Sequence, residues 1–432
     1  MLGPPLIPTE MTDPRWRGLM TRTSQDVVEA QGLVAVVPPV RSSDYSLCCR
    51  SPFSYYMRRR LGITEALSWS KALSRGSWMH ERFRHLYRTA EDASSCYYRA
   101  LDLRVEELTS ACAELGIDGD ARRSIVEREI RDAETSYAWH DAASRVVISR
   151  DHGTFAEFLR RPYWRVLARE ARLVSQLPRG WHKVHCVAQP DLLLWHEGQG
   201  SVWIVDLKTT SESPRTRAAS CPIEFQHLHY CSIASELLRR GVMQKRFDLP
   251  SDARLGGFIH LIVRKPTIEF GMKDRHFTLD DSPLRSGPRK GEPRNERVYH
   301  GEPVLENYVR RCRDWYAATG EHEHLAAEWA ADPPVNMSIC TWSPDDRARR
   351  QYEAARDLVA RWAMRTPDPD AFPRPAQLSL HGRLDPLSPF MLLPYEQWGE
   401  IVRQERFVVA RRDDLPPDAD YDVIPDPETV LE

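Results

Sequence analysis

Residues 189–210 read QPDLLLWHEGQGSVWIVDLKTT, which is two apolar runs separated by a glycine-bounded turn. Asp191 opens the first run and Asp206 closes the second. Antiparallel pairing across the turn predicts a β-hairpin that brings the two carboxylates to the same end. Because two carboxylates held together repel each other, such a pair usually requires a cation.

The types of residue at this end of the hairpin indicate which cation. Carboxylate oxygens are the ligands that Mg²⁺ and Mn²⁺ prefer. Lys208 follows Asp206 by two residues and adds a positive group beside the metal, where an attacking hydroxide or a phosphoryl oxygen would sit. Taken singly, Asp191 is an ordinary turn residue after a proline, and Asp206 with Lys208 is an ordinary ion pair at a strand end.

Four short motifs together resemble a known family. Pro190-Asp191 and Asp206-Leu207-Lys208 are similar to the two halves of the PD-(D/E)xK nuclease motif. Residues 226–230, QHLHY, resemble the QxxxY element of the RecB-like exonuclease branch, and residues 76–81, GSWMHE, resemble the GxxxH helix of that branch. The motifs occur in the order of the family, within about residues 42–265.

The resemblance implies an α/β fold with a restriction-endonuclease-like core, in which helices flank a mixed central sheet. It also implies a metal held by His80, Asp191, Asp206 and the backbone carbonyl of Leu207. Lys208 would then orient the attacking water or stabilise the transition state. Asp191, Asp206 and Lys208 are therefore the expected catalytic residues.

The remaining motif residues have supporting roles in this interpretation. Glu81 is the fallback metal ligand, since some relatives use an acidic residue on the equivalent helix. Gln226 and Tyr230 lie four residues apart, share a helix face and would position the substrate, as would Thr209. The alternatives are an ordinary amphipathic helix for the first two and an ordinary strand end for Thr209.

Composition excludes several classes of protein. The formal net charge of −2 over 432 residues gives no global basic field, so DNA would be attracted by local cations. The nine cysteines are an odd number without a small disulfide framework, which favours a reducing compartment. We find neither a signal peptide nor an apolar run long enough to cross a membrane. We therefore expect a cytoplasmic protein of a bacterium or a phage-infected cell, with no membrane partner.

The sequence divides into four expected parts. Residues 1–41 are an irregular, proline-rich arm, and residues 42–320 are the nuclease core with a helical insertion at about residues 90–150. Residues 321–412 are an irregular, partly helical extension. Residues 413–432 contain eight acidic side chains and four prolines, which predicts a disordered tail. This tail is a candidate binding segment for a recombination protein such as a single-strand annealing protein; an inert solubilising tail is the alternative.

Some relatives carry an iron–sulfur cluster held by one upstream and three closely spaced downstream cysteines. This chain has Cys48 and Cys49 upstream but only Cys312 and Cys340 downstream, so we expect no cluster. Packing within residues 300–394 would then supply the stabilisation that a cluster provides in those relatives. Mg²⁺ or Mn²⁺ is then the expected cofactor.

The function predicted from these observations is a metal-dependent DNA exonuclease that acts in recombination, repair or phage DNA processing. The alternatives are an inactive DNA-binding module with the same fold and a restriction-type endonuclease. We expect three groups of cations to hold the DNA: residues 58–60, the arginines around residue 160, and the loop at 266–300.

Overall fold

The computed structural model describes most of the chain. The described residues are 28–30, 33, 35–65, 71–85, 90–144, 146–176, 184–266, 269–304, 306–308, 310–311, 333–343, 346–366, 368–374, 379–380, 383–384, 387–404, 407–409 and 421–424. The predicted arm at residues 1–41 lies mostly outside them, as do Cys312 and most of the acidic tail.

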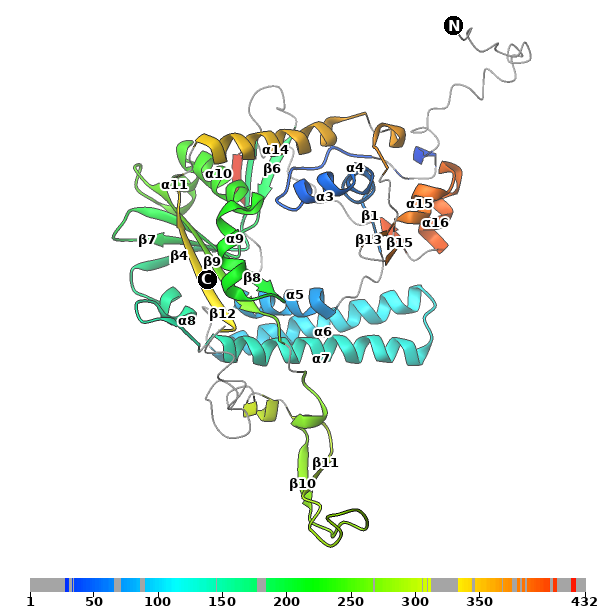
Figure 1. Cartoon of the computed structure of the whole chain (residues 1–432). Coiled ribbons are helices and arrows are strands. Elements are labelled where there is room, and N and C mark those ends of the chain that lie inside the picture. Colours follow the sequence, from blue (N-terminus) through cyan, green and yellow to red (C-terminus); the bar gives the residue numbers. More distant parts are fainter. Residues whose placement is uncertain are drawn as a thin grey trace, which may run out of the picture.

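A five-stranded mixed sheet lies on the left-hand side of the molecule as seen in Figure 1. Its strands follow the order β12-β9-β8-β7-β4, and only β8 and β9 pair in parallel. The strands are β4 (Trp164–Arg169), β7 (Leu192–His196), β8 (Ser201–Thr210), β9 (Arg254–Arg264) and β12 (Val335–Thr341). Strand β12 lies beyond residue 320, so the core extends further than the boundary that we drew from the sequence.

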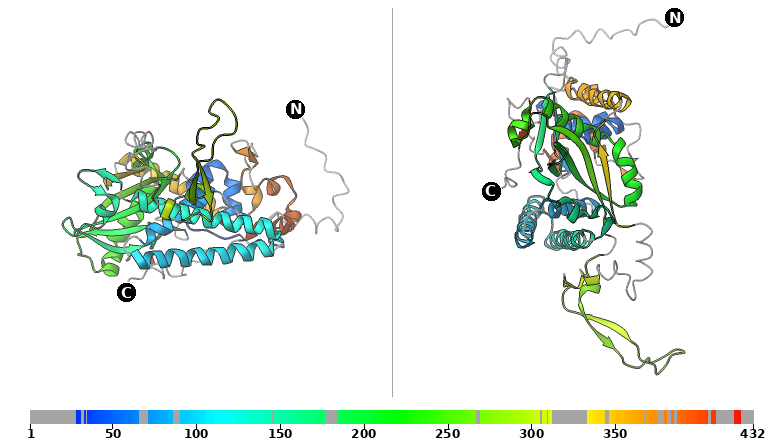
Figure 2. Two further views of the ribbon diagram at one scale, coloured as in Figure 1. Left: turned by 90° about the horizontal axis from the view of Figure 1, so that it is seen from below. Right: turned by 90° about the vertical axis from the view of Figure 1, so that its left-hand side faces the viewer.

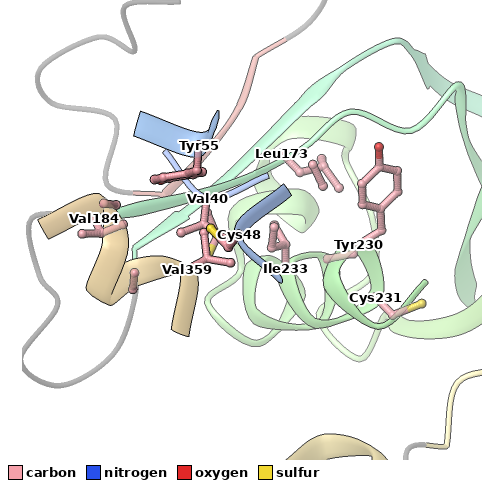
Figure 3. Close-up of a cluster of buried hydrophobic side chains, with 14 of the residues drawn as sticks. Val40, Cys48, Tyr55, Leu173, Val184, Tyr230, Cys231, Ile233 and Val359 are labelled. Carbon is pink, nitrogen blue, oxygen red and sulfur yellow. The ribbon is translucent and has the colours of Figure 1, made fainter. Parts of the chain in front are cut away.

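Successive side chains along each strand point to opposite faces of the sheet, and both faces are apolar. Leu193, Ile204 and Phe258 belong to the core shared with α10 (Phe225–Arg239), and Figure 3 shows the α10 side chains of this core. Leu194 and Leu207 belong to the opposite core, which includes side chains of three helices: α5 (Lys71–Arg84), α7 (Gly119–Ala143) and α8 (Phe155–Leu159). Helices therefore cover both faces of the sheet, which confirms the predicted fold class.

The predicted helical insertion is present as two long helices. Helices α6 (Ala90–Glu114) and α7 lie side by side with α5 (Figures 1 and 2), and a small core around Tyr97 joins them. A short β2–β3 pair (Val147–Ser149 and Gly153–Thr154) leads from α7 to α8. From the sequence we also expected one helix over residues 155–173, and this is wrong in its second half, because α8 ends at Leu159 and β4 follows.

A second sheet of three strands has the order β16-β5-β6. Strands β5 (Arg172–Gln176) and β6 (His185–Ala188) precede the central hairpin, and β16 (Tyr421–Ile424) comes from the acidic tail. The prediction that the whole tail is disordered is therefore wrong for these four residues. Their sequence, YDVI, combines an aromatic and two β-branched side chains, which favour a strand despite the acidic surroundings.

An aromatic staple joins the N-terminal helices to the C-terminal extension. Helices α3 (Asp44–Arg50) and α4 (Pro52–Tyr55) lead into one wider turn, η2 (Tyr56–Arg60). Phe53 packs edge-on against Trp398, and Tyr56 packs against Phe372. Strand β1 (Ile63–Glu65) pairs with β15 (Phe407–Val409). Of these partners, only Phe372 lies within residues 300–394, where we expected packing in place of an iron–sulfur cluster.

The other elements complete the two layers. Helix α14 (Asp346–Met364) contacts α3 and α10 and buries Tyr352 and Val359, as its periodicity predicts. The remaining elements are α9 (Pro214–Ser220), η3 (Cys221–Ile223), α11 (Val242–Phe247), η6 (Pro369–Ala371), β13 (Ser379–Leu380), β14 (Arg383–Leu384), α15 (Ser388–Leu392), η7 (Tyr395–Gln397) and α16 (Trp398–Gln404).

A second β-hairpin projects from the body beside α7 (Figures 1 and 2). After the single turn η4 (Met272–Asp274), strand β10 (His276–Asp280) pairs with β11 (Glu296–His300). The sequence predicted a mobile loop here, because glycine, proline and charged residues dominate residues 266–300. That prediction is wrong for the two strands, whose alternating residues are too short a pattern to identify within such a composition.

Candidate active site

The central hairpin brings its two acidic residues together as the sequence predicts. Leu192 pairs with Val205, so Asp191 and Asp206 are the next residues on the two strands. The side chains of Ile204 and Asp206 lie on the same face of β8 because successive residues alternate. Ile204 packs in the core of α10, so Asp206 and Lys208 point toward that helix.

Asp191 is buried and pairs with His80. Its Oδ1 lies 3.1 Å from Nδ1 of His80, and its Oδ2 accepts a hydrogen bond from the backbone N–H of Leu207. Burial alone would raise the pKa of Asp191. The His80 charge and these hydrogen bonds outweigh burial, so the pKa of Asp191 lies below its usual range. Burial lowers the pKa of His80, while the Asp191 carboxylate raises it more, to about 9. The metal-free pair is therefore an ion pair.

Asp206 is held by Lys208 and Gln226. The Lys208 ammonium pairs with one oxygen of Asp206 and donates to Oε1 of Gln226. The other oxygen of Asp206 accepts a hydrogen bond of 3.3 Å from the Gln226 amide. Burial, followed by repulsion from Asp191, raises the pKa of Asp206 despite the opposing effect of Lys208. The two carboxylates therefore disfavour each other's charge, as their predicted proximity requires.

Helix α5 presents His80 to this end of the hairpin. A Cβ on Gly76 would lie 3.1 Å from Oγ1 of Thr209, so the small glycine lets the helix approach the end of β8 closely. His80 lies one turn further along, on the same side of the helix. The fallback ligand Glu81 instead binds Nε2 of His85 at 3.0 Å. The structure thus places His80, rather than Glu81, against Asp191.

Tyr230 and Thr209 line the same pocket of about 690 Å³, together with His80 and Asp191. The Tyr230 hydroxyl donates a hydrogen bond of 3.2 Å to the carbonyl of Gln189, just before the Pro-Asp pair. Tyr230 is buried beside the aliphatic core of α10 (Figure 3). Gln226 and Tyr230 therefore both contact the hairpin, which agrees with their predicted shared face.

Glu170 is a pocket residue that the sequence analysis missed. It lies between β4 and β5, and its backbone has a left-handed φ of +48°. Its N–H donates to the carbonyl of Asp191, and its carboxylate accepts from the Gln189 amide. Burial and the Asp191 carboxylate raise its pKa to about 8. Glu170 belongs to none of the motifs in the sequence, so nothing in the local pattern distinguished this acidic residue.

Two buried histidines lie close to Asp206, and the sequence analysis identified neither of them. His260 is the partner of Asp206 in the parallel β8–β9 register. Its Nε2 lies 3.1 Å from Nδ1 of His227 on α10. Burial lowers the pKa of His227 to about 4 and that of His260 to about 2. Both rings are therefore neutral, and Lys208 remains the positive group on this side of Asp206.

The donor set fits a divalent cation. Among the described residues, no three His, Cys, Asp or Glu side chains are already arranged as a metal-ligand group. Each carboxylate is instead neutralised by a cationic side chain, Asp191 by His80 and Asp206 by Lys208. Two opposed buried carboxylates with a histidine nitrogen suit Mg²⁺ or Mn²⁺ chemically, and Glu170 adds a third carboxyl group to the pocket. His80 would have to lose its proton to become a ligand.

Comparison with known proteins bears directly on this geometry. A family model described as the PD-(D/E)XK nuclease superfamily matches residues 42–344. The chain belongs to the PD-(D/E)XK nuclease superfamily. The match spans the central sheet, both flanking helix layers and every candidate site residue. No individual curated protein matches the chain significantly. In the described parts of this nuclease, no helix combines the length and apolarity needed to cross a membrane.

Membership in this superfamily of metal-dependent nucleases makes DNA the expected substrate. The structure revises which of the arginines predicted from the sequence could contact it. Arg60 is buried and donates to the carbonyls of Val36 and Arg365, so its role is structural. Arg59 lines the pocket, where it pairs with Asp44. Arg161 and Arg165 lie at the end of α8 and in β4 rather than on a long helix.

Proposed function

We propose that this nuclease is a metal-dependent DNA exonuclease that hydrolyses phosphodiester bonds from strand ends. The observation that supports the proposal best is the meeting of His80, Asp191, Asp206, Lys208 and Gln226 at one end of the β7–β8 hairpin. Metal-dependent phosphodiester hydrolysis uses acidic ligands for a cation and a positive side chain for the phosphoryl oxygens. It also needs a residue that holds this positive side chain in place.

The protein residues have distinct roles in this mechanism. Asp191, Asp206, His80 and the carbonyl of Leu207 would hold Mg²⁺ or Mn²⁺, which when bound neutralises the phosphate charge and activates water. Lys208 donates to the attacking water or to a phosphoryl oxygen. Gln226 accepts from Lys208 and donates to Asp206, so it fixes the ammonium relative to the carboxylate. Thr209, at the pocket wall, orients the phosphate.

The exonuclease assignment depends on α10. Gln226 contacts the catalytic pair and Tyr230 contacts the residue two before Asp191, which is the pattern of the QxxxY element. A restriction-type endonuclease would require a surface for reading its target sequence, and no motif in the chain indicates such a surface. We further propose that the protein acts in recombination, repair or phage DNA processing in the cytoplasm, with DNA as its main partner.

One assay separates the exonuclease from the alternatives. Linear DNA labelled at either end and covalently closed circular DNA are incubated with Mg²⁺, with Mn²⁺ or with EDTA. We expect degradation of linear DNA alone, dependent on the metal ion. Cleavage of the closed circle would make the protein an endonuclease. Binding of both substrates without cleavage would make it a DNA-binding module that retains the nuclease fold.

A further inference from the structure

The first turn of α10 is joined to two neighbouring strands of the central sheet. Asp206 on β8 and His260 on β9 are register partners in the parallel pair, so their side chains lie next to each other on the face that α10 covers. Gln226 donates a hydrogen bond of 3.3 Å to Asp206. Nδ1 of His227, the next residue of the helix, lies 3.1 Å from Nε2 of His260. Two consecutive residues of α10 therefore bind the two members of one register pair.

The start of α10 depends on these contacts for its position. The N-cap residue, Glu224, uses its carboxylate to bind Arg217 at 2.9 Å and Ser220 at 3.2 Å rather than to cap the first turn. A first turn without a side-chain cap is held less firmly, because its backbone N–H groups have no intrahelical acceptors. The bonds from Gln226 and His227 to the sheet therefore fix this turn.

Both histidines are buried in an aromatic layer between α10 and β9. His227 is 5% exposed and His260 is fully buried. The ring of His260 stacks on Phe258 with the ring centroids 4.1 Å apart, and the centroid of His227 lies 5.0 Å from that of the same phenylalanine. The ring of Trp342 also borders His227. Because this packing excludes water from His260, its hydrogen bond with His227 is not readily exchanged for one with solvent.

The hydrogen bond between the two neutral rings has a preferred direction. Nδ1 of His260 is buried and has no hydrogen-bond partner within the described part of the chain. A proton on this nitrogen would be an unsatisfied buried donor, so the ring favours its proton on Nε2. Nε2 of His260 then donates and Nδ1 of His227 accepts. The strand therefore supplies the donor and the helix supplies the acceptor.

The role of Gln226 makes the position of this turn important for the site. Its amide must accept from Lys208 and donate to Asp206 at the same time. A rotation of the first turn about the helix axis would break both contacts. One attachment to β8 permits such a rotation, whereas a second attachment to β9, through His227, opposes it.

We propose that His227 and His260 form a positioning pair for the cleavage reaction, which holds the first turn of α10 so that Gln226 keeps Lys208 beside Asp206. The proposal rests on the proposed function, because it assigns the pair a role in phosphodiester hydrolysis. The two histidines act through Gln226 and touch neither the substrate nor the metal.

The test compares substitutions of the pair with a matched control on the same helix. His227→Leu and His260→Leu each remove the hydrogen bond, while His229→Leu removes a buried histidine that binds Tyr352 and Val187 instead. Single-turnover cleavage of linear DNA in Mg²⁺, DNA affinity in EDTA and thermal unfolding are measured for each protein. We expect the two pair variants to cut about fivefold more slowly with unchanged affinity. The control should lose stability and keep its rate.

The variant that lacks both histidines separates positioning from stability. A single leucine leaves the other ring with an unsatisfied buried nitrogen, whereas combining His227→Leu with His260→Leu removes both partners. Much of the thermal stability should therefore return in the double variant, which also keeps the test available if a single variant does not fold. Its cleavage rate should stay low, because Gln226 still lacks the second attachment. Recovery of the rate together with the stability would make the pair core packing alone and would overturn the proposal.

Two further measurements test the route through Gln226. His227→Asn keeps an oxygen near the position of Nδ1, where it can accept from His260, so this variant should cut faster than His227→Leu. In the background of Gln226→Ala, His227→Leu should cause no further loss of rate, because both changes act on the same contact. Independent effects of these two substitutions, which multiply in the combined variant, would contradict the proposed route.

Failure of the proposed function gives a different result. Wild-type protein that leaves linear DNA intact in both Mg²⁺ and Mn²⁺ would remove the proposed activity, and the role of the pair with it. Cleavage by the wild type, with the same rate in folded His227→Leu and His260→Leu, would instead remove the pair alone and leave the proposed function in place.

Discussion

Two β-hairpins of this nuclease, β7–β8 and β10–β11, each place two acidic residues opposite each other, but in different environments. In β7–β8, Asp191 and Asp206 are buried between neighbouring strands and helices. In β10–β11, Asp280 pairs with Glu296 on a projecting ribbon, and Arg294 lies 3.6 Å from one and 3.8 Å from the other. Burial raises the pKa of Asp206, whereas hydrogen bonds from Ser282 lower that of the half-buried Asp280.

The comparison shows that an acidic cross-strand pair is not by itself a catalytic site. Water and the Arg294 side chain neutralise the pair on the projecting ribbon at little cost. The buried pair has no such solvent, so its charge must be neutralised by fixed groups, which are His80 and Lys208 in the absence of metal. A bound cation can then replace them, because the pair already holds a position suited to positive charge.

The largest expected effect is the loss of cleavage in Asp206→Asn, with Asp280→Asn as the matched control. Removing the buried carboxylate should lower the single-turnover rate by about a hundredfold or more, while Asp280→Asn should cut at the wild-type rate. Stability without metal should change little, because lost repulsion from Asp191 offsets the lost pairing with Lys208. Equal rates for the two variants would remove Asp206 from the site. Asp191→Asn and Lys208→Ala should behave like Asp206→Asn.

The second prediction concerns acid stability of the body. His229 Nε2 donates to the carbonyl of Val187 at 3.1 Å, so Nδ1 of the neutral ring accepts from the Tyr352 hydroxyl at 3.0 Å; burial lowers the pKa of His229 to about 4. The unfolded chain binds a proton near pH 6.5 and the folded protein does not, so stability is complete above that pH and is lost as the pH falls toward 4. The loss for this one histidine is up to about 3 kcal/mol.

Denaturant unfolding at pH 7 and pH 4.5 measures that loss. His229→Gln keeps a polar side chain but cannot titrate, so its stability should fall less between the two pH values than that of the wild type. An equal fall in both proteins would assign the acid sensitivity to other groups. His140, whose pKa burial lowers to about 3, is the first of these to test.

The third prediction separates alignment from attraction. Gln226→Ala should lower the single-turnover rate by about tenfold while DNA affinity stays nearly constant, because Gln226 positions Lys208 and not the strand. Tyr230→Phe should have a smaller effect of the same kind. If Gln226→Ala instead lowers affinity and keeps the rate, α10 is a binding surface.

The sequence predicted the central hairpin well, for an identifiable reason. A continuous apolar run on each side of a glycine turn allows one register, and Gly200 has the left-handed φ of +60° that such a turn favours. The positions of Asp191 and Asp206 follow from that register. His80, Gln226 and Tyr230 needed the family resemblance as well, since their helices could have packed on the sheet in other ways.

Other features depend on contacts far apart in the sequence. Strand β12 joins the sheet beside β9, and Arg60 is buried where it donates a hydrogen bond to the carbonyl of Arg365. No local sequence pattern indicates either contact. Glu170 acquires its raised pKa from burial beside Asp191. The pocket that Ser43 and Arg172 line likewise requires α3 and β5 to meet. These properties follow from tertiary packing, which overrides the local composition.

The smallest expected effect is that of replacing the projecting hairpin. A short Gly-Ser turn in place of residues 276–300 should change the free energy of unfolding by no more than about 0.5 kcal/mol, because those residues are mostly exposed. Loss of Arg285 and Lys290 should lower the salt slope of DNA binding by about one unit or less per contact, without changing the single-turnover rate. A large loss of stability would show that the ribbon supports the body.

The pairing of β16 with β5 has a consequence for the order of assembly. Arg172, which lines the pocket, is the register partner of Ile424, so this edge of β5 stays uncovered until residues 421–424 have left the ribosome. We expect the central hairpin, whose strands are neighbours in sequence, to form much earlier. Pulse-labelled hydrogen exchange should therefore protect the amides of β7 and β8 before those of β5. The two carboxylates of the candidate site would then come together before the edge of β5 is covered.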